Sequence, residues 1–348
     1  MTHRLDYKTA AEGTVADILL APLLQREEDF RIVDVGARNG MLDVPPSYAA
    51  HANFIGFEPN VDEYEKLLSG TTDAAKHGFV PPRWKTKTYY PYALWSSPQI
   101  RPFKITAGAG TCTLMDGVSE AVTQRMYLQY PDERRQRPFY NQLADIRDAT
   151  KVECRRLDEL IESDRPIDYL KLDVEGAELE ALKGAENLFA KNRVLFVKTE
   201  FVMVPYYDEH PLFGHQQALL ERWRMRFLGF DLAHVHYTRD QSFIPPAVDR
   251  RLIHAGDAFF ALDPDRNRLT GEDLHRMGIM CIVHGFVSFG LSLIRDGNLL
   301  SVQAFKAIEM ALARVPLRRR ARYLFEQFPY FVAARLNRLA VYIPRGRR

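Results

Sequence analysis

The chain has 348 residues, 46% of them hydrophobic and 26% charged, a balance typical of a soluble globular protein rather than of a disordered chain. This length allows one large α/β domain, or one domain of about 250 residues with an addition to it. The three cysteines are far apart and in no metal-like spacing, which argues against a disulfide framework and a zinc site and favours a reduced compartment.

Charge is distributed unevenly along the chain. Residues 314–348 hold ten arginines, one acid and no lysine, which gives this tail a charge of +9 and leaves −7 on residues 1–313. Apolar and aromatic residues separate its basic clusters, so the tail indicates either peripheral contact with the inner face of a membrane or a solvated basic face. It carries no groove-reading or base-stacking motif, and we expect no nucleic acid partner. The N-terminus lacks the apolar stretch of a secretory signal, which favours a cytoplasmic location.

The first predicted elements are a helix over residues 14–25 and a buried strand over 31–36. The strand is the first part of RIVDVGARNG (31–40) and carries Asp34 near its end. The glycines at 36 and 40 indicate a tight turn before a helix. Glycine has no Cβ, so we expect the backbone here to approach a ligand and its N–H groups to face it.

The second predicted strand, NFIGFEPN (53–60), ends in Glu58 and precedes a helix from about Val61 to Leu68. An acid at this position can accept both hydroxyl protons of a ribose. The chain has neither the dinucleotide fingerprint G-x-G-x-x-G at this turn nor a P-loop. The pattern D-x-G-x-x-x-G, with an acid ending the next strand, instead resembles the S-adenosylmethionine loop of class I methyltransferases.

The next segments add a third strand and a loop. Residues 84–97 alternate as one strand ending in Ala93 and Leu94, which either completes the core or lies over an adenine ring. Residues 103–114 predict a short strand and a glycine-rich loop that serves as a substrate loop or a simple turn. Residues 116–150 predict a helix and an excursion over the surface.

The segment IDYLKLDVEGAELEALKGAENLF (167–189) predicts a buried strand followed by one amphipathic helix. Asp173 and Glu175 stand at the end of that strand, and the following strand, VLFVKTE, ends in Glu200. The carboxyl ends of parallel strands meet at one edge of a sheet, so these acids and Asp34 are expected together where open α/β sheets bind ligands.

The rest of the sheet is expected to follow a polar aromatic stretch. Residues 201–216 suggest a lid or acceptor loop, and a helix over 217–228, a strand over 230–237 and a strand near 257–262 complete the sheet.

Two further helices are predicted after the sheet. A helix over 277–294 is interpreted as buried in a helical appendage rather than as a membrane span, and a helix over 302–315 is expected to pair with it.

Three motifs in this order resemble the FkbM-like methyltransferases: DVGARNG, FEPN and LKLDVEGAELEALKGA, with VECRRLDEL before the last. The resemblance covers about residues 30–262. It implies a class I methyltransferase fold, a Rossmann-like, doubly wound, mostly parallel sheet, preceded by an N-terminal helical segment (1–29) and followed by the helical appendage with its basic amphipathic tail (263–348). The family usually has Asn directly after Gly-Ala, where this chain has Arg38.

The resemblance implies an S-adenosylmethionine-dependent O-methyltransferase acting on a hydroxyl of a sugar, a glycan or a related natural product. The residues expected to bind the cofactor are Asp34, Gly36, Ala37, Arg38, Gly40, Glu58, Pro59, Ala93, Leu94 and Asp173. Asp173, Glu175 and Glu200 are the expected catalytic acids, with Glu175 or Glu200 as a base or acceptor-binding group. Glu175 could instead be a first-turn acid stabilised by the helix dipole. No metal site is expected.

Two other functions stay open at this point. Asp173 and Glu175 could form the acidic pair of a metal-dependent glycosyltransferase, although Gly176 then opens a helix at once and the Gly36 turn has no role. A non-catalytic protein could keep the fold while the appendage and tail dock on a membrane or partner, and the appendage could support a homo-oligomer. The intact set of Gly36, Gly40 and Glu58 argues against lost cofactor binding.

Overall fold

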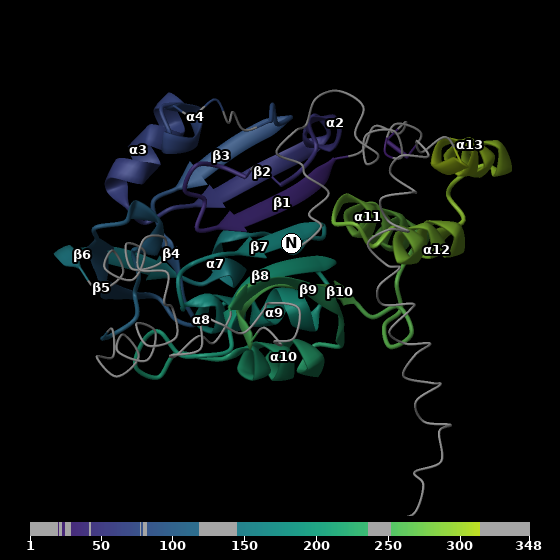
Figure 1. Cartoon of the computed structure of the whole chain (residues 1–348). Helices are drawn as coiled ribbons and strands as arrows, with labels where there is room; N and C mark the ends of the chain where they lie inside the picture. The colour runs from purple at the N-terminus through teal and green to yellow at the C-terminus, as the bar shows by residue number, and fades with distance from the viewer. Residues whose placement is uncertain are drawn as a thin grey trace, which may run out of the picture.

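The computed structural model of the chain, shown in Figure 1, describes residues 20, 23–24, 29–41, 43–76, 78, 82–117, 145–235 and 252–313. The basic tail over 314–348, most of the helix predicted over 14–25 and most of the segment 116–150 lie outside the described residues.

A seven-stranded, mostly parallel sheet forms the centre of the molecule (Figure 1). The first five strands of this order pair in parallel, and the last two pair antiparallel. The strand order reverses between β1 and β7, which makes the sheet doubly wound and opens a crevice at its carboxyl edge. The order is β3 (Thr86–Tyr90), β2 (Ala52–Phe57), β1 (Phe30–Val35), β7 (Tyr169–Leu172), β8 (Phe196–Val202), β10 (Leu252–Leu262) and β9 (Met225–Val235). The predicted fold class is confirmed.

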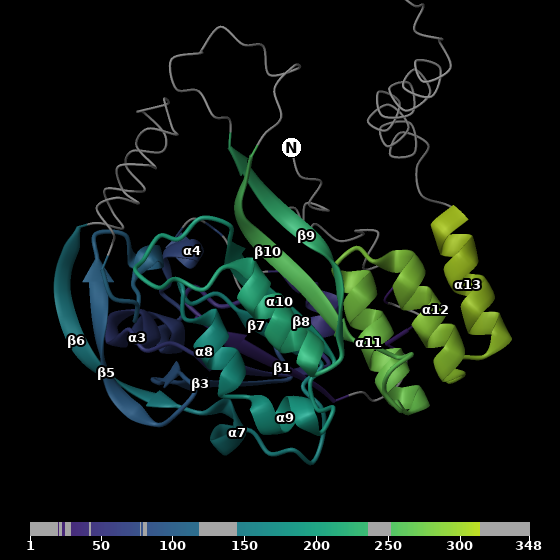
Figure 2. The ribbon, with the colours of Figure 1, turned by 90° about the horizontal axis from the view of Figure 1, so that it is seen from below.

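Helices cover both faces of this sheet. Figure 2 shows α8, α9 and α10 on one side of strands β9 and β10, and α11, α12 and α13 on the other. All six residues of β1 are buried, as expected for a strand covered on both faces. The helices are α2 (Pro46–Ala49), α3 (Val61–Ser69), α4 (Asp73–Lys76), α7 (Leu157–Leu160), α8 (Glu178–Lys183), α9 (Glu186–Ala190), α10 (Phe213–Arg222), α11 (Gly271–Val283), α12 (Val287–Gly297) and α13 (Val302–Ala313).

A second, three-stranded sheet stands beside the carboxyl edge of the first. It consists of β4 (Ala93–Leu94), β6 (Ile146–Arg155) and β5 (Gln99–Thr106), and a short 3-10 turn, η2 (Ala109–Thr111), follows β5. The prediction of one strand over 84–97 is therefore wrong. Pro91 has no N–H to donate, so the ladder of β3 stops before it and the chain crosses into the small sheet at β4.

Several predicted boundaries are also corrected. Residues 146–150 belong to strand β6 rather than to a surface excursion. The single helix predicted after Gly176 is two helices, because α8 ends at Lys183 and α9 begins at Glu186. A Cβ on Gly184, between them, would collide with the carbonyl oxygen of Trp95. The helix expected over 217–228 is α10, which ends at Arg222, and β9 begins at Met225.

The helix predicted over 277–294 is two helices, α11 and α12. Gly285, with φ of +87°, turns the chain between them. The two helices cross closely, since a Cβ on Gly278 would lie 2.7 Å from the carbonyl oxygen of Gly290. No helix in the described part of the chain combines the length and apolarity that a membrane span needs.

Helix α11 is part of the main core. Met277 and Ile279 belong to the same hydrophobic cluster as the central strands. The buried guanidinium of Arg276 donates to both carboxylate oxygens of Asp168, at 2.8 and 2.9 Å, and Asp168 precedes β7. The helices after β10 are thus joined to the sheet by apolar packing and by a buried ion pair.

Candidate functional site

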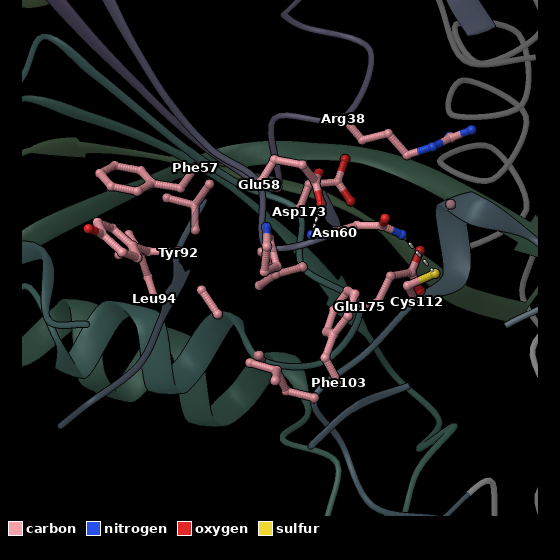
Figure 3. A pocket seen from close by; sticks show the side chains of 18 of the residues that line it. Arg38, Phe57, Glu58, Asn60, Tyr92, Leu94, Phe103, Cys112, Asp173 and Glu175 are labelled. Atoms are coloured by element: carbon pink, nitrogen blue, oxygen red, sulfur yellow. Dashed lines mark hydrogen bonds between the residues drawn. The ribbon is translucent and has the colours of Figure 1, made fainter. Parts of the chain in front are cut away.

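A cavity of about 600 Å³ lies at the carboxyl edge of β1, β2 and β7, next to the small sheet (Figure 3). Eight of the predicted site residues line it: Gly36, Arg38, Glu58, Pro59, Ala93, Leu94, Asp173 and Glu175. Asp34, Ala37, Gly40 and Glu200 are not among its lining residues. The cavity also exposes residues that the sequence did not single out, among them Phe57, Asn60, Tyr92, Phe103 and Cys112.

The turn after β1 is shaped by Gly36, which has φ of +84°. A Cβ at this position would collide with the backbone carbonyl oxygen of Asp173, so the turn and the end of β7 approach each other through a glycine. The expectation that the N–H groups of this turn face a ligand is wrong for three of them. The N–H of Gly40 donates to the carbonyl oxygen of Ala37 at 2.8 Å. Gly36 and Ala37 both donate to the carbonyl oxygen of Phe57, at 3.0 and 2.9 Å.

Asp34 lies buried beneath the cavity and is only 1% exposed. The Lys171 ammonium lies 3.1 Å from Asp34 and 3.4 Å from Asp173. Burial raises the pKa of Asp34 to about 6, against the opposing effect of Lys171. Burial alone would lower the pKa of Lys171, but the two carboxylates raise it. Asp34 therefore forms an ion pair with the Lys171 ammonium, which also pairs with Asp173 at the cavity wall.

Glu58 directly follows β2, and it lines the cavity. It accepts a hydrogen bond from the backbone N–H of Asn60 at 2.9 Å, and the Asn60 side chain in turn caps α3. Burial raises the pKa of Glu58 to about 7. The start of α3 thus fixes the position at which this carboxylate meets a ligand.

Arg38 neither reaches freely into the cavity nor points away to solvent. Its guanidinium donates to Glu63 and to Asp73, each at 3.1 Å, and so connects the turn after β1 to α3 and α4. The side chain is 27% exposed and passes along the rim of the cavity (Figure 3).

The other wall of the cavity is apolar. Leu94 and Phe103 come from the small sheet, and Tyr92 precedes it (Figure 3). The loop over 108–113 also contributes, through Ala109, Gly110 and Cys112. Flat apolar and aromatic surfaces of this kind suit a purine ring, and the acid at the end of β2 suits the ribose beside it.

Three of the predicted acids come together near the cavity. The carboxylate oxygens of Asp173, Glu175 and Glu200 lie within 4.8 Å of one another, and we call these three residues the acidic cluster. Burial raises the pKa of Glu175 and of Glu200 well above the usual range, and the neighbouring carboxylates raise both further. The cluster therefore attracts protons or cations.

Glu178, which the sequence did not single out, holds the loop that carries two of these acids. Its buried carboxylate accepts the N–H of Val174 at 2.9 Å and that of Gly176 at 3.1 Å. Glu178, and not Glu175, is thus the acid that satisfies the free N–H groups ahead of α8. Glu175 does not accept these N–H groups. Its backbone has φ of +53°, and its carboxylate belongs to the acidic cluster.

The residues of the cavity fit S-adenosylmethionine. Glu58 provides a ribose acceptor next to the turn at Gly36, and the small sheet provides an apolar wall.

Comparison with known proteins gives the family. The sequence matches the Methyltransferase FkbM domain over residues 34–232, which is more than half of the chain. No curated protein sequence matches it.

Solved structures are similar to the chain only remotely. Magnesium protoporphyrin IX methyltransferase (ChlM) from Synechocystis with bound SAM has 10% identity and a TM-score of 0.32, over 76% of this chain and 86% of that one. Precorrin-6y C5,15-methyltransferase from Geobacter metallireducens has 10% identity and a TM-score of 0.30, over 74% and 93%. On the strength of the sequence match, the chain belongs to the FkbM family of S-adenosylmethionine-dependent methyltransferases.

Proposed function

We propose that this methyltransferase transfers its methyl group to a hydroxyl oxygen of a sugar, a glycan or a related natural product. The observation that carries the proposal is the acidic cluster beside the cofactor cavity, with Asp173 and Glu175 on both the cavity wall and the cluster. Carboxylates at such a place can accept hydrogen bonds from acceptor hydroxyls and take up the proton that transfer releases.

The bound cofactor supplies a methyl group on a positively charged sulfur, and transfer forms a C–O bond, breaks the C–S bond and releases the hydroxyl proton. The protein's part is to align the acceptor oxygen and to receive that proton. A carboxylate with a raised pKa is a stronger base than an ordinary one, so Glu175 and Glu200 suit this task. Asp173, which is 45% exposed and paired with Lys171, suits a contact to the cofactor.

The aromatic residues Tyr206, Tyr207 and His210 after β8 are buried, at 8%, 2% and 8% exposed, and pack against one another. The ring of Tyr206 lies 5.8 Å from that of His210, and the ring of Tyr207 lies 5.1 Å from it. Burial lowers the pKa of His210 to about 4, so its ring is neutral at pH 7, and its Nδ1 accepts the N–H of Tyr206.

The experiment has two stages. Isothermal titration with S-adenosylhomocysteine first measures cofactor binding to the folded protein. Incubation with methyl-labelled cofactor and a panel of sugars and glycans then measures transfer, and NMR of the product identifies an O-methyl ether. Product methylated on nitrogen or carbon, or folded protein that binds no cofactor, would contradict the proposal.

Family membership favours methyl transfer over the glycosyltransferase and the non-catalytic alternatives. Contact of residues 314–348 with a membrane, a cytoplasmic location and a homo-oligomer formed through the helices after β10 stay predictions. A truncation after Ala313 is the suitable test, because it leaves α11–α13 in place. Loss of vesicle binding with full activity on a soluble acceptor would assign the tail to localisation.

A further inference from the structure

Lys171 places a charge inside a central strand of the large sheet. It lies in register with Asp34 on the neighbouring strand β1, and its ammonium donates to Asp34 at 3.1 Å. The two side chains are 14% and 1% exposed. Replacing a buried ion pair by apolar residues is often neutral or stabilising, so stability alone gives no reason for this pair. We therefore looked for its role in the site that it adjoins.

A second lysine on the same face of the sheet provides a comparison. Lys198 on β8 lies in register with Lys171 on β7 and is buried to a similar degree, with 11% of its side chain exposed. Its ammonium pairs with Asp43 at 3.0 Å and with Asp257 at 3.3 Å. Each lysine thus has two carboxylate partners, and in this respect the two are matched.

The two lysines differ in where their partners lie. Asp173, the second partner of Lys171, lines the cofactor cavity, whereas Lys198, Asp43 and Asp257 are not among its lining residues. The Lys171 ammonium lies 3.4 Å from the Oδ2 atom of Asp173, and no other cation in the described part of the chain pairs with this carboxylate. Of the two ion-pair groups, only that of Lys171 reaches the cavity.

The Asp173 carboxylate needs such a partner to keep its place. Its backbone is fixed, since its N–H donates to the carbonyl oxygen of Val35 at 3.0 Å, but its side chain is 45% exposed and would otherwise change rotamer. The carboxylate oxygens of Glu175 and Glu200 lie within 4.8 Å of it and repel it when ionised. Lys171 opposes both effects from the opposite side of the charge.

We propose that Lys171 is a positioning residue for cofactor binding, anchored on Asp34 and holding the Asp173 carboxylate at the cavity wall. The inference rests on the contact between Asp173 and the cofactor that belongs to the proposed function. Lys171 occupies Oδ2 of Asp173, so Oδ1 stays available to a donor of the cofactor, such as its amino group. A carboxylate held in one orientation loses less conformational entropy when the cofactor binds.

The test measures the affinity of the full chain for S-adenosylhomocysteine by titration calorimetry. Lys171→Met is expected to weaken binding about tenfold, because Asp173 is no longer held in place. Lys198→Met is the matched control. It removes an equally buried cation with two carboxylate partners and is expected to lower stability but to leave the affinity unchanged. A merely structural role of Lys171 would make the two variants alike, and that result would overturn the inference.

A double-mutant cycle tests whether Lys171 acts through Asp173. Asp173→Asn alone is expected to weaken S-adenosylhomocysteine binding, and Lys171→Met is expected to add no further loss in that background. Additive losses would show that Lys171 affects the cofactor by another route. Unchanged affinity in either single variant would also contradict the inference.

A second background guards against misfolding, because Lys171→Met leaves the buried Asp34 without its cation. The combination of Asp34→Asn with Lys171→Met removes both charges and is expected to fold. Adding Asp173→Asn to it should change the affinity little, since Asp173 is already displaced, and a full loss at this step would overturn the inference. These titrations contain no acceptor, so their outcome is independent of the NMR identification of an O-methyl product, which tests the proposed function.

Discussion

At the scale of single residues, the site depends on close contacts that only particular side chains allow. Gly36 is the clearest case, since its missing Cβ lets the turn after β1 approach the carbonyl of Asp173. We expect Gly36→Ala to lower the free energy of unfolding by about 2–4 kcal/mol and to weaken binding of S-adenosylhomocysteine, because the backbone must move.

A matched control for this substitution is Gly70→Ala. Gly70 also has positive φ, +72°, but a Cβ there would meet nothing within 4 Å. Gly70→Ala is expected to cost only the left-handed conformation of alanine, about 1–2 kcal/mol, and to leave cofactor affinity unchanged. Urea denaturation and titration calorimetry measure the two effects. Equal losses of unfolding free energy and of cofactor affinity in both variants would show that the close contact between Gly36 and Asp173 contributes to neither.

Glu58 links the site to pH. Its pKa is raised by burial from 4.5 to about 7, so the folded protein holds the proton more tightly than the unfolded chain does. The contribution of Glu58 to stability is therefore present below pH 4.5 and is lost as the pH rises to 7. Glu58→Gln is expected to raise the free energy of unfolding of the cofactor-free protein at pH 8 by on the order of 1–3 kcal/mol and to weaken cofactor binding.

Denaturation at pH 8 and at pH 5, with and without the substitution, checks this prediction. The two proteins should differ less at pH 5, where Glu58 is mostly protonated. Glu65→Gln is the control, since Glu65 is exposed on α3 and is expected to change neither quantity. If Glu58→Gln stabilised the protein equally at both pH values, the raised pKa of Glu58 would not be the cause of the stabilisation.

At the scale of elements, the sequence predicted the strands that end in acids and missed the breaks between elements. The apolar runs that became β1, β2, β7 and β8 each have a carboxylate near their carboxyl end, so their type and shared edge could be derived locally. Asp34 and Glu200 lie inside β1 and β8 rather than at their ends, whereas Glu58 and Asp173 directly follow β2 and β7. The sequence pattern does not reveal the breaks at Pro91, Gly184 and Gly285, because each lies inside a pattern that is otherwise regular.

The sequence does not predict some residues of the cavity, because their positions depend on tertiary packing. Tyr92 and Phe103 line the cavity because a second sheet stands beside the first, and no local pattern indicates that pairing. Glu178 takes its role from its hydrogen bond with the N–H of Gly176. The acids were found because their place depends only on strand direction, whereas the apolar wall depends on tertiary packing.

The loop before α8 depends on one side chain. We expect Glu178→Ala to lower the free energy of unfolding by about 1–3 kcal/mol, because the N–H groups of Val174 and Gly176 lose their acceptor. Glu178→Gln keeps an acceptor oxygen and is expected to retain most of the stability. Thermal and urea unfolding compare the three proteins, and equal losses in both variants would show that the charge of Glu178, rather than hydrogen bonding, holds the loop.

At the scale of the whole molecule, the ion pair between Arg276 and Asp168 ties α11 to the sheet. Asp168 is 0% exposed, so Arg276→Met leaves a buried carboxylate without its cation. The expected loss is about 3–5 kcal/mol of unfolding free energy, and Asp168→Asn combined with Arg276→Met is expected to recover part of it. Arg266→Met, which breaks an exposed pair with Glu221, is the control and is expected to cost at most about 1 kcal/mol.

The place of β10 in the sheet has a consequence for the fragments that can be produced. The family match ends at residue 232, within β9, yet β10 lies between β8 and β9 and comes later in the chain. A fragment cut to that match would expose the unpaired edge of β8 and the apolar surface that α11 covers, and such edges promote aggregation. We expect residues 30–232 to be recovered as inclusion bodies and residues 1–313 as soluble protein, because the catalytic unit is closed only by segments that follow the family's own boundary.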